Sequence, residues 1–144
     1  SEEATSPAPL VTVEEARIEW VQGDTDEALT TLDGAMAECD ELREVRISAL
    51  RAKGVSMDVD MPEVVQVALL RADVLESDGR VAEAIEVLAD ALAEDPIMAD
   101  VLVRRARLYA TLGSVEESRA DYERALQMIP DYQPALEGLE QLDD

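Results

Sequence analysis

The feature of this sequence that most constrains its fold is a segment that recurs after 34 residues. Residues 65–98 and 99–132 align without gaps and are identical at nine of 34 positions. Pro62, Pro96 and Pro130 are also 34 residues apart. A fixed period of this length, with glycine and proline in phase, indicates stacked copies of one supersecondary unit. The identical pairs are Val67/Val101, Arg71/Arg105, Ala72/Ala106, Gly79/Gly113, Val81/Val115, Glu83/Glu117, Ala91/Ala125, Leu92/Leu126 and Pro96/Pro130.

Each copy has the pattern of two helices joined by a short turn. Apolar residues recur at helical spacing in 63–78 and 81–94, and again in 98–112 and 115–128. Asp78-Gly79 and Leu112-Gly113 interrupt the pattern, as turns do. The residue before a proline avoids the α conformation, so the second helix of each copy is predicted to end at Asp95-Pro96 and Ile129-Pro130. Small residues are predicted where helices touch: Ala72, Ala84, Ala91, Ala106 and Ala125.

These residues resemble the pattern of the tetratricopeptide repeat family. The resemblance implies an all-α fold, a right-handed α-solenoid of helix–turn–helix repeats. Arg71 and Arg105 depart from the family, which prefers leucine there; we expect their stems to cover the apolar seam while the guanidinium groups reach water. The matching positions are Ala68, Arg71-Ala72, Leu75, Ala84, Leu88, Ala91 and Pro96 in the first unit, and Leu102, Arg105-Ala106, Tyr109, Ser118, Tyr122, Ala125 and Pro130 in the second.

The flanking segments fit the period less closely. Gly23 and Gly79 are 56 residues apart, which is 22 more than one period. We therefore expect a helix near 11–22, an overlong or kinked helix over 25–53 that ends at Gly54, and a loop to residue 62. A last helix over 132–142 is predicted to shield the apolar end of the array. The predicted organisation is a disordered tail (1–9), a degenerate repeat with the long helix and loop (10–62), two repeats (63–96 and 97–130) and a capping helix (131–144).

The composition excludes several classes of function. Thirty-four acidic and 12 basic residues give a net charge of −22, which argues against nucleic acid and anionic membranes as partners. No segment has the roughly 18 apolar residues of a membrane span. Histidine is absent and Cys39 is the single cysteine, which removes the usual catalytic bases and metal ligands. We expect no cofactor, no metal and no enzyme activity. Cys39 is interpreted as a small buried residue.

The remaining acidic and glycine motifs are interpreted as structural. Neither Asp24/Asp26 nor Asp58/Asp60 is followed by the glycine and final glutamate of a calcium loop, so both pairs are expected at helix caps and turns. The six glycines are isolated, so no phosphate-binding loop is predicted.

Two basic clusters stand out from the acidic background. Arg43, Arg46, Arg51 and Lys53 lie close together with only Glu44 among them. They form either an ion-pairing helix face or a docking patch for an acidic partner. Arg104, Arg105 and Arg107 form the second cluster, for which internal ion pairing is again the alternative.

The resemblance implies a candidate binding groove, because the first helix of each repeat lines the concave face in this family. It places Leu69, Leu70 and Val103 on an apolar floor, and Arg104 and Arg107 on a wall that faces solvent. Asp73 joins them on this face. Family members that clamp a terminal carboxylate use groove asparagine and lysine; this chain has no asparagine and its one lysine lies outside the clear repeats, so that clamp is not expected.

The repeats and the missing catalytic groups favour a protein–protein interaction scaffold or adaptor, which docks a peptide or protein segment in the groove. Two alternatives stay open: a secretion- or assembly-type chaperone that shields apolar client segments, and a scaffold that assembles with itself through repeat edges, hence a homo-oligomer. The cytoplasm is the favoured location, and an extracytoplasmic domain of a longer chain is the alternative.

Overall fold

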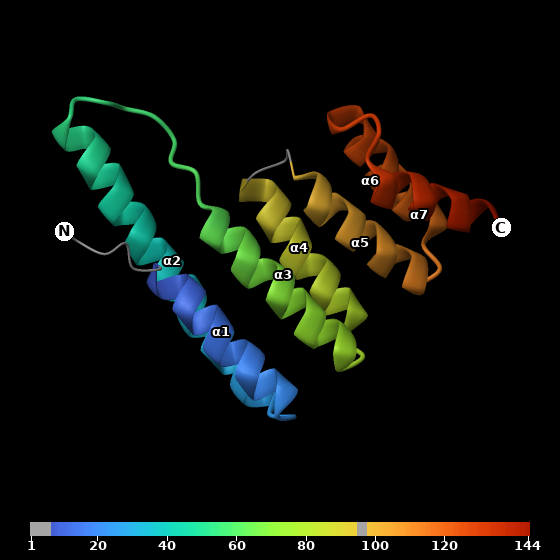
Figure 1. Cartoon of the computed structure of the whole chain (residues 1–144), viewed down its shortest axis with the longest axis horizontal. Coiled ribbons are helices and arrows are strands. Elements are labelled where there is room, and N and C mark those ends of the chain that lie inside the picture. The colour runs from blue at the N-terminus through green and yellow to red at the C-terminus, as the bar shows by residue number, and fades with distance from the viewer. Residues whose placement is uncertain (1–6, 95–97) are drawn as a thin grey trace. The chain divides into compact units, whose positions relative to one another are not determined.

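The computed structural model describes residues 7–94 and 98–144, and all regular structure in these ranges is helical. The seven expected helices are present, most within one residue of their predicted ends (Figure 1). The long second helix is continuous over 28 residues. The helices are α1 (Ala8–Val21), α2 (Thr25–Ala52), α3 (Pro62–Ser77), α4 (Val81–Glu94), α5 (Ala99–Thr111), α6 (Val115–Met128) and α7 (Gln133–Asp143).

The first helix begins at Ala8, earlier than predicted, so the assignment of residues 8 and 9 to a disordered tail is wrong. Pro9 lies in the first turn and is buried. A proline is tolerated there because its missing N–H would have no acceptor within the helix. Residues 1–6 of the predicted tail and the predicted stop at Asp95-Pro96 lie outside the described residues. The division into repeats at 63–96 and 97–130 stays a prediction.

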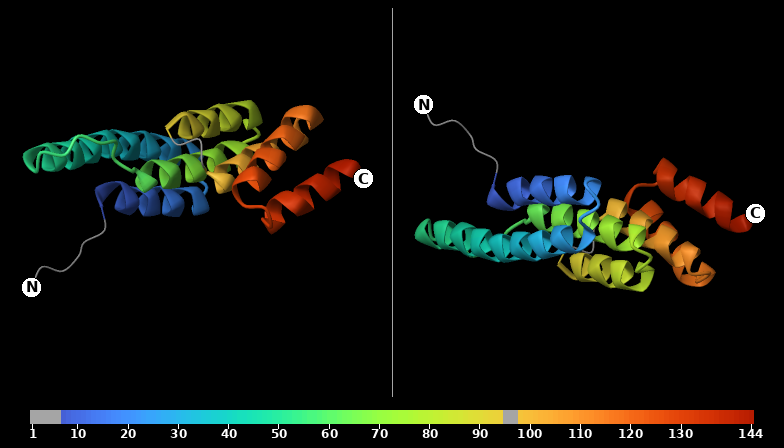
Figure 2. Two further views of the ribbon diagram at one scale, coloured as in Figure 1. Left: turned by 90° about the horizontal axis from the view of Figure 1, so that it is seen from above. Right: turned by 90° about the horizontal axis from the view of Figure 1, so that it is seen from below.

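The chain divides into two compact units, Ser1–Leu70 and Arg71–Asp144. In the first, α1 and α2 form an antiparallel hairpin (Figure 2). The Thr12 hydroxyl donates a hydrogen bond of 2.5 Å to the Glu38 carboxylate. The buried side chains along this hairpin are mostly small, which allows the two helices to approach closely: Val13, Ala16, Ala28, Leu32, Ala35 and Cys39.

In the second unit, α5 packs between α4 and α6, and α7 covers α6 and part of α5. The small residues predicted at helix contacts are buried, and Ala84, Ala106 and Ala125 completely so. Ser118 is also fully buried, and its hydroxyl donates a hydrogen bond of 2.7 Å to the carbonyl oxygen of Ala106. This bond satisfies a polar group that would otherwise be costly to bury. The predicted shield helix α7 buries Ala135 and Gly138, while Leu136 stays 40% exposed.

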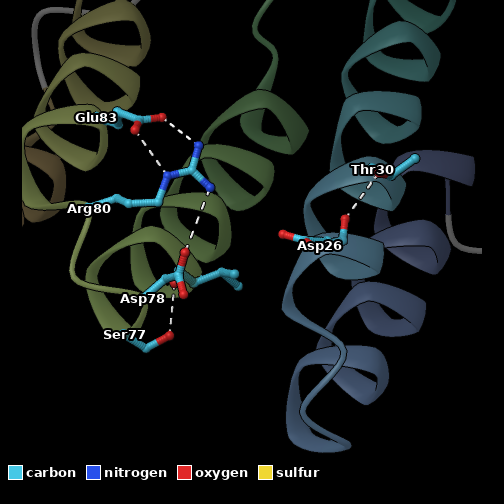
Figure 3. Close-up of polar contacts among 7 residues, drawn as sticks. Asp26, Thr30, Ser77, Asp78, Arg80 and Glu83 are labelled. Atoms are coloured by element: carbon cyan, nitrogen blue, oxygen red, sulfur yellow. Dashed lines mark hydrogen bonds and ion pairs between the residues drawn. The ribbon is translucent and has the colours of Figure 1, made fainter.

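The two glycines that are in phase in the sequence make identical turns. Gly79 and Gly113 have φ of 78° and 79°, a left-handed conformation in which residues with a side chain are strained. The N–H of Gly113 donates to Ala110 and that of Ser114 to Tyr109, and the same pair of bonds forms around Gly79. This is the Schellman ending, which satisfies the last carbonyls of α3 and α5. After the first turn, Arg80 pairs with Asp78 and Glu83 at 3.8 and 2.6 Å (Figure 3).

Candidate functional site

One face of α5 gathers most of the polar residues that are candidates for binding. Asp100, Arg104 and Arg107 are spaced by four and three residues, so they share a side of the helix. Each interacts with another helix or its start within the second unit. The Tyr132 hydroxyl, at the start of α7, donates a hydrogen bond of 2.5 Å to Asp100, and Arg104 forms an ion pair with Asp73 of α3. We call Asp73, Asp100, Arg104, Arg107, Tyr122 and Tyr132 the α5 face.

The pairing of Arg104 with Asp73 corrects one expectation and supports its alternative. Arg104 does not face solvent alone, because its guanidinium is held by the Asp73 carboxylate. The two side chains are 34% and 30% exposed, so water still reaches the pair. An ion pair with this exposure is worth little net stability, and a ligand carboxylate can compete with Asp73 for the arginine.

Arg107 is the second cation of this face. It is exposed, and within residues 7–94 and 98–144 it forms no ion pair. Its neighbour is the buried Tyr122 ring: burial raises the pKa of the Tyr122 phenol, and the Arg107 guanidinium partly offsets that rise. The pKa of Tyr132 is also raised, mainly by its hydrogen bond to Asp100. Both phenols therefore stay neutral at physiological pH.

The predicted apolar floor is largely wrong. Leu70 and Val103 are only 2% and 3% exposed, and Leu69 is half-buried. Val103 shares its side of α5 with buried Ala99 and Ala106, because residues four and three apart lie on one face. Leu70 shares its side of α3 with Val67 and Val74 in the same way. These side chains belong to the core, so the α5 face is polar.

Sequence reasoning missed three residues of the α5 face, namely Asp100, Tyr122 and Tyr132. The helical spacing of Asp100 relative to Arg104 and Arg107 was available as a signal. The repeat pattern assigns Tyr122 to a repeat position only, and nothing in the sequence indicates that Tyr132 contacts Asp100, which lies 32 residues away. Their meeting depends on how α7 packs against α5.

The arginine between the groove residues has a structural role. We expected the Arg105 guanidinium to reach water; instead it forms two hydrogen bonds, of 2.7 and 2.8 Å, with the Asp121 carboxylate of α6. The side chains of the pair are 16% and 5% exposed. The guanidinium also lies 5.6 Å from the centre of the Tyr109 ring. The Asp121 carboxylate thus compensates the guanidinium charge in this poorly solvated seam.

The cluster at the end of α2 is divided between paired and unpaired cations. Arg46 binds the buried Glu63 carboxylate through two bonds of 2.5 and 3.0 Å, and this hydrogen bonding lowers the pKa of Glu63. Arg43 lies 3.9 Å from Asp40. The interpretation as an ion-pairing face thus holds for Arg43 and Arg46. Arg51 and Lys53 are exposed and form no ion pair with any residue that the structure describes.

The other candidates behave as structural residues. Cys39 is fully buried, and burial, followed by the charge of Glu63, raises its thiol pKa to about 11. Within the described ranges no group of three His, Cys, Asp or Glu side chains could hold a metal ion, and no helix is long and apolar enough to cross a membrane. The first unit contains an open cleft of about 570 Å³ between α1 and the start of α3, lined by Leu10, Val11, Val13, Glu14, Arg17, Pro62, Glu63 and Gln66.

Comparison with known proteins identifies similar folds. A family model described as tetratricopeptide repeat (TPR) matches residues 46–96 and 69–132, which together cover more than half of the chain. The first TPR domain of human RPAP3 is 21% identical, with a TM-score of 0.68 over 94% of this chain and 89% of that one. The first TPR of Spaghetti (RPAP3), solved with the HSP90 peptide SRMEEVD, is 22% identical, with a TM-score of 0.69 over 97% and 96%.

The second TPR domain of human RPAP3, solved with the HSP70 peptide SGPTIEEVD, is 16% identical, with a TM-score of 0.66 over 95% and 99% of the two chains. No curated protein sequence matches the chain. At these identities the likeness to the solved domains concerns the fold.

Proposed function

Because the chain belongs to the tetratricopeptide repeat family, we propose that it is a protein-interaction module, which binds a segment of a partner protein and has no catalytic activity of its own. Two of the similar domains were solved with bound peptides, SRMEEVD and SGPTIEEVD. The absence of histidine from the sequence agrees with a role that requires no acid–base chemistry.

The α5 face supports a finer proposal about the partner. Its exposed arginine, Arg107, has no carboxylate partner among the described residues, and the exposed pair of Arg104 with Asp73 can open at small cost. Arginine holds a carboxylate through two parallel hydrogen bonds. We therefore expect a partner segment with at least one carboxylate beside apolar side chains, bound weakly, as fits so short an array.

The charge of the whole chain adds selectivity to this site. With a net charge of −22, most of the surface repels an acidic segment. The α5 face is one place where such a segment meets a cation, so electrostatics favour approach there over other orientations. The exposed Arg107 guanidinium, which forms no ion pair among the described residues, is the single observation that carries this finer proposal.

The chaperone alternative loses the observation that favoured it. It required an exposed apolar floor for client segments, and two of the three floor residues, Leu70 and Val103, are buried. Self-assembly through repeat edges has no specific support, so the test below measures it alongside binding.

The proposal is tested with a displayed library of short random peptides. The chain should enrich peptides that place Asp or Glu next to Leu, Ile or Val, and Arg107→Glu should lose this enrichment. The matched control is Arg124→Glu, which makes the same charge change at an exposed arginine of α6 that forms no ion pair within the described residues. Circular dichroism checks that both variants fold.

Three results would contradict the proposal. The first is enrichment of basic peptides from the library. The second is an acidic preference that Arg107→Glu retains. The third is an equal loss of this preference in Arg124→Glu, which would indicate a general effect of charge. Light scattering at several protein concentrations, with and without peptide, separates peptide binding from self-assembly. For Arg104 the variant is Arg104→Gln, because glutamate there would face Asp73 and add a repulsion unrelated to the ligand.

A further inference from the structure

The second half of α2 is an extension that the hairpin does not require. The helix has 28 residues, whereas its partner α1 and the later helices α4 and α6 have 14 each. The bond from Thr12 places the start of α1 beside Glu38, so the remaining turns of α2 continue past the start of α1. Figure 1 shows this end of α2 and the loop that leads from it to α3.

The extension is held in a fixed position. The Arg46 guanidinium forms two bonds with Glu63, whose side chain is only 4% exposed, and also donates a bond of 3.3 Å to the carbonyl oxygen of Asp60. One arginine in the middle of the extension thus ties it to the end of the loop and to the first turn of α3. A bidentate pair on one buried carboxylate defines geometry more strictly than a solvent-exposed pair does.

Beyond this tie, the end of α2 and the start of the loop carry exposed apolar side chains and cations that form no ion pair among the described residues. Arg51 and Lys53 are exposed and without ion pairs among the described residues. Val55 and Met57, just after them, are 38% and 64% exposed. The whole segment 45–57 contains no carboxylate, although 34 of the 144 residues are acidic. We call Arg51, Lys53, Val55 and Met57 the tip surface.

We propose that the tip surface is a second docking site, separate from the α5 face, and that its occupant is an acidic segment of a partner protein that also presents an apolar side chain. Charge complementarity selects this occupant, because a basic segment finds many carboxylates elsewhere on the chain and two cations here. The apolar requirement follows from Met57 and Val55, which gain from burial under a partner. Two cations neutralise too few phosphates to hold nucleic acid on a chain of this net charge.

The test uses Lys53, which is the only lysine in the sequence. A short synthetic peptide of leucine and glutamate carries an amine-reactive ester, and mass spectrometry of the whole chain followed by digestion gives the rate of acylation at Lys53. Docking raises the local concentration of the ester, so we expect a rate about tenfold above that of a glycine–glutamate or leucine–arginine peptide with the same ester.

Two variants keep the lysine and each replace one other residue of the tip surface: Arg51→Glu and Met57→Ser. Each should abolish most of the acceleration. Their controls in the first unit are Arg17→Gln, at an arginine whose side chain is 46% exposed and which pairs with Glu14, and Val21→Ser, at a valine that is 81% exposed; both should retain it. Circular dichroism checks α2 in Arg51→Glu, because a basic residue in the last turn also stabilises the helix end. If that helix frays, Met57→Ser decides the outcome.

Several results would overturn the proposal. Equal rates with leucine–glutamate and glycine–glutamate peptides would mean simple charge attraction to a lysine. An acceleration that survives both tip variants but disappears in Arg107→Glu would place the peptide on the α5 face. Protection of Lys53 by phosphatidylserine vesicles, against a small amine reagent, would favour a membrane. A concentration-dependent dimer that Met57→Ser dissociates would make a second copy of this chain the occupant.

Discussion

Two arginines of the basic clusters, for which ion pairing was one alternative, each have a buried carboxylate as partner. Arg105 pairs with Asp121 across the contact of α5 and α6, and Arg46 pairs with Glu63 between α2 and the start of α3. In both pairs the carboxylate is the more buried member. Removing one partner of such a pair leaves an uncompensated charge in a poorly solvated place, whereas removing both together is often nearly neutral.

Asp121→Ala should destabilise the second unit by about 3 kcal/mol, because the Arg105 guanidinium loses both of its hydrogen bonds. The double variant Arg105→Leu with Asp121→Leu should recover much of this loss. Urea unfolding followed by tyrosine fluorescence measures both, since Tyr109, Tyr122 and Tyr132 all lie in this unit. If Asp121→Ala unfolds like the parent chain, the ion pair contributes nothing to stability.

Glu63 should make the first unit sensitive to acid. Arg46 lowers the pKa of this carboxyl below its usual 4.5, so the pairing stabilises the fold above pH 4.5 and the contribution is lost as pH falls through the lowered pKa. Glu63→Gln should therefore cost about 1–2 kcal/mol at pH 7. The difference from the parent chain should shrink as pH falls below 4.5. Unfolding is followed by the fluorescence of Trp20, the only tryptophan, and a pH-independent difference would contradict the assignment.

At the scale of the helices, small residues fix how closely neighbours approach. Gly138 of α7 lies against the buried Tyr122 ring of α6, and a Cβ atom there would come within 2.1–2.6 Å of three ring and hydroxyl atoms. Gly34 of α2 is also helical, but a Cβ atom there meets nothing within 4 Å. Replacement by alanine is therefore expected to change the free energy of unfolding in opposite directions at these two glycines.

Gly138→Ala should destabilise the second unit by about 1–3 kcal/mol, because the 3% exposed Tyr122 side chain has no space into which it can move. Gly34→Ala should stabilise the first unit by about 0.5–1 kcal/mol, since alanine loses less backbone entropy in a helix. Thermal melts give the first from tyrosine and the second from tryptophan fluorescence. A neutral Gly138→Ala would mean that α7 does not pack on α6 as described.

At the scale of the whole molecule, charge is the dominant feature. The net charge is −22, and the ion pairs on the exposed surface, such as Arg17 with Glu14 at 3.5 Å, contribute little. The carboxylates in excess over the basic residues repel one another, and folding into a compact state brings these like charges closer together. Stability should therefore depend on ionic strength even though no ligand is involved.

The melting temperature should rise as NaCl increases from about 0.01 to about 0.15 M, where the screening length falls from roughly 30 to 8 Å. Each kcal/mol of repulsion relieved should raise it by several degrees, roughly 4 °C. Differential scanning calorimetry measures this, and potassium glutamate in place of NaCl checks that chloride binding is not the cause. A flat response would show that the carboxylates are already paired or well dispersed.

The sequence by itself determined the helices and their ends, because these depend on local chemistry. Apolar spacing predicted α3 to α7 within about one residue of their ends, and Gly79 and Gly113 marked turns that only a residue tolerant of positive φ makes without strain. The start of α1 was less predictable, since a proline such as Pro9 is equally compatible with a linker and with the first turn of a helix.

Only the tertiary structure decided which face of each helix meets which neighbour, and this changed the candidate site. Helical spacing placed Arg104 and Arg107 on one side of α5, but it could not say that Asp73 would hold Arg104 or that Leu70 and Val103 would be buried. The same holds for Arg46, which sequence proximity grouped with Arg51 and Lys53 and packing joined to Glu63. The periodicity of a sequence determines how residues are oriented around the axis of one helix. An ion pair between two helices also depends on the distance between them, and that distance is determined by packing among residues that are far apart in the sequence.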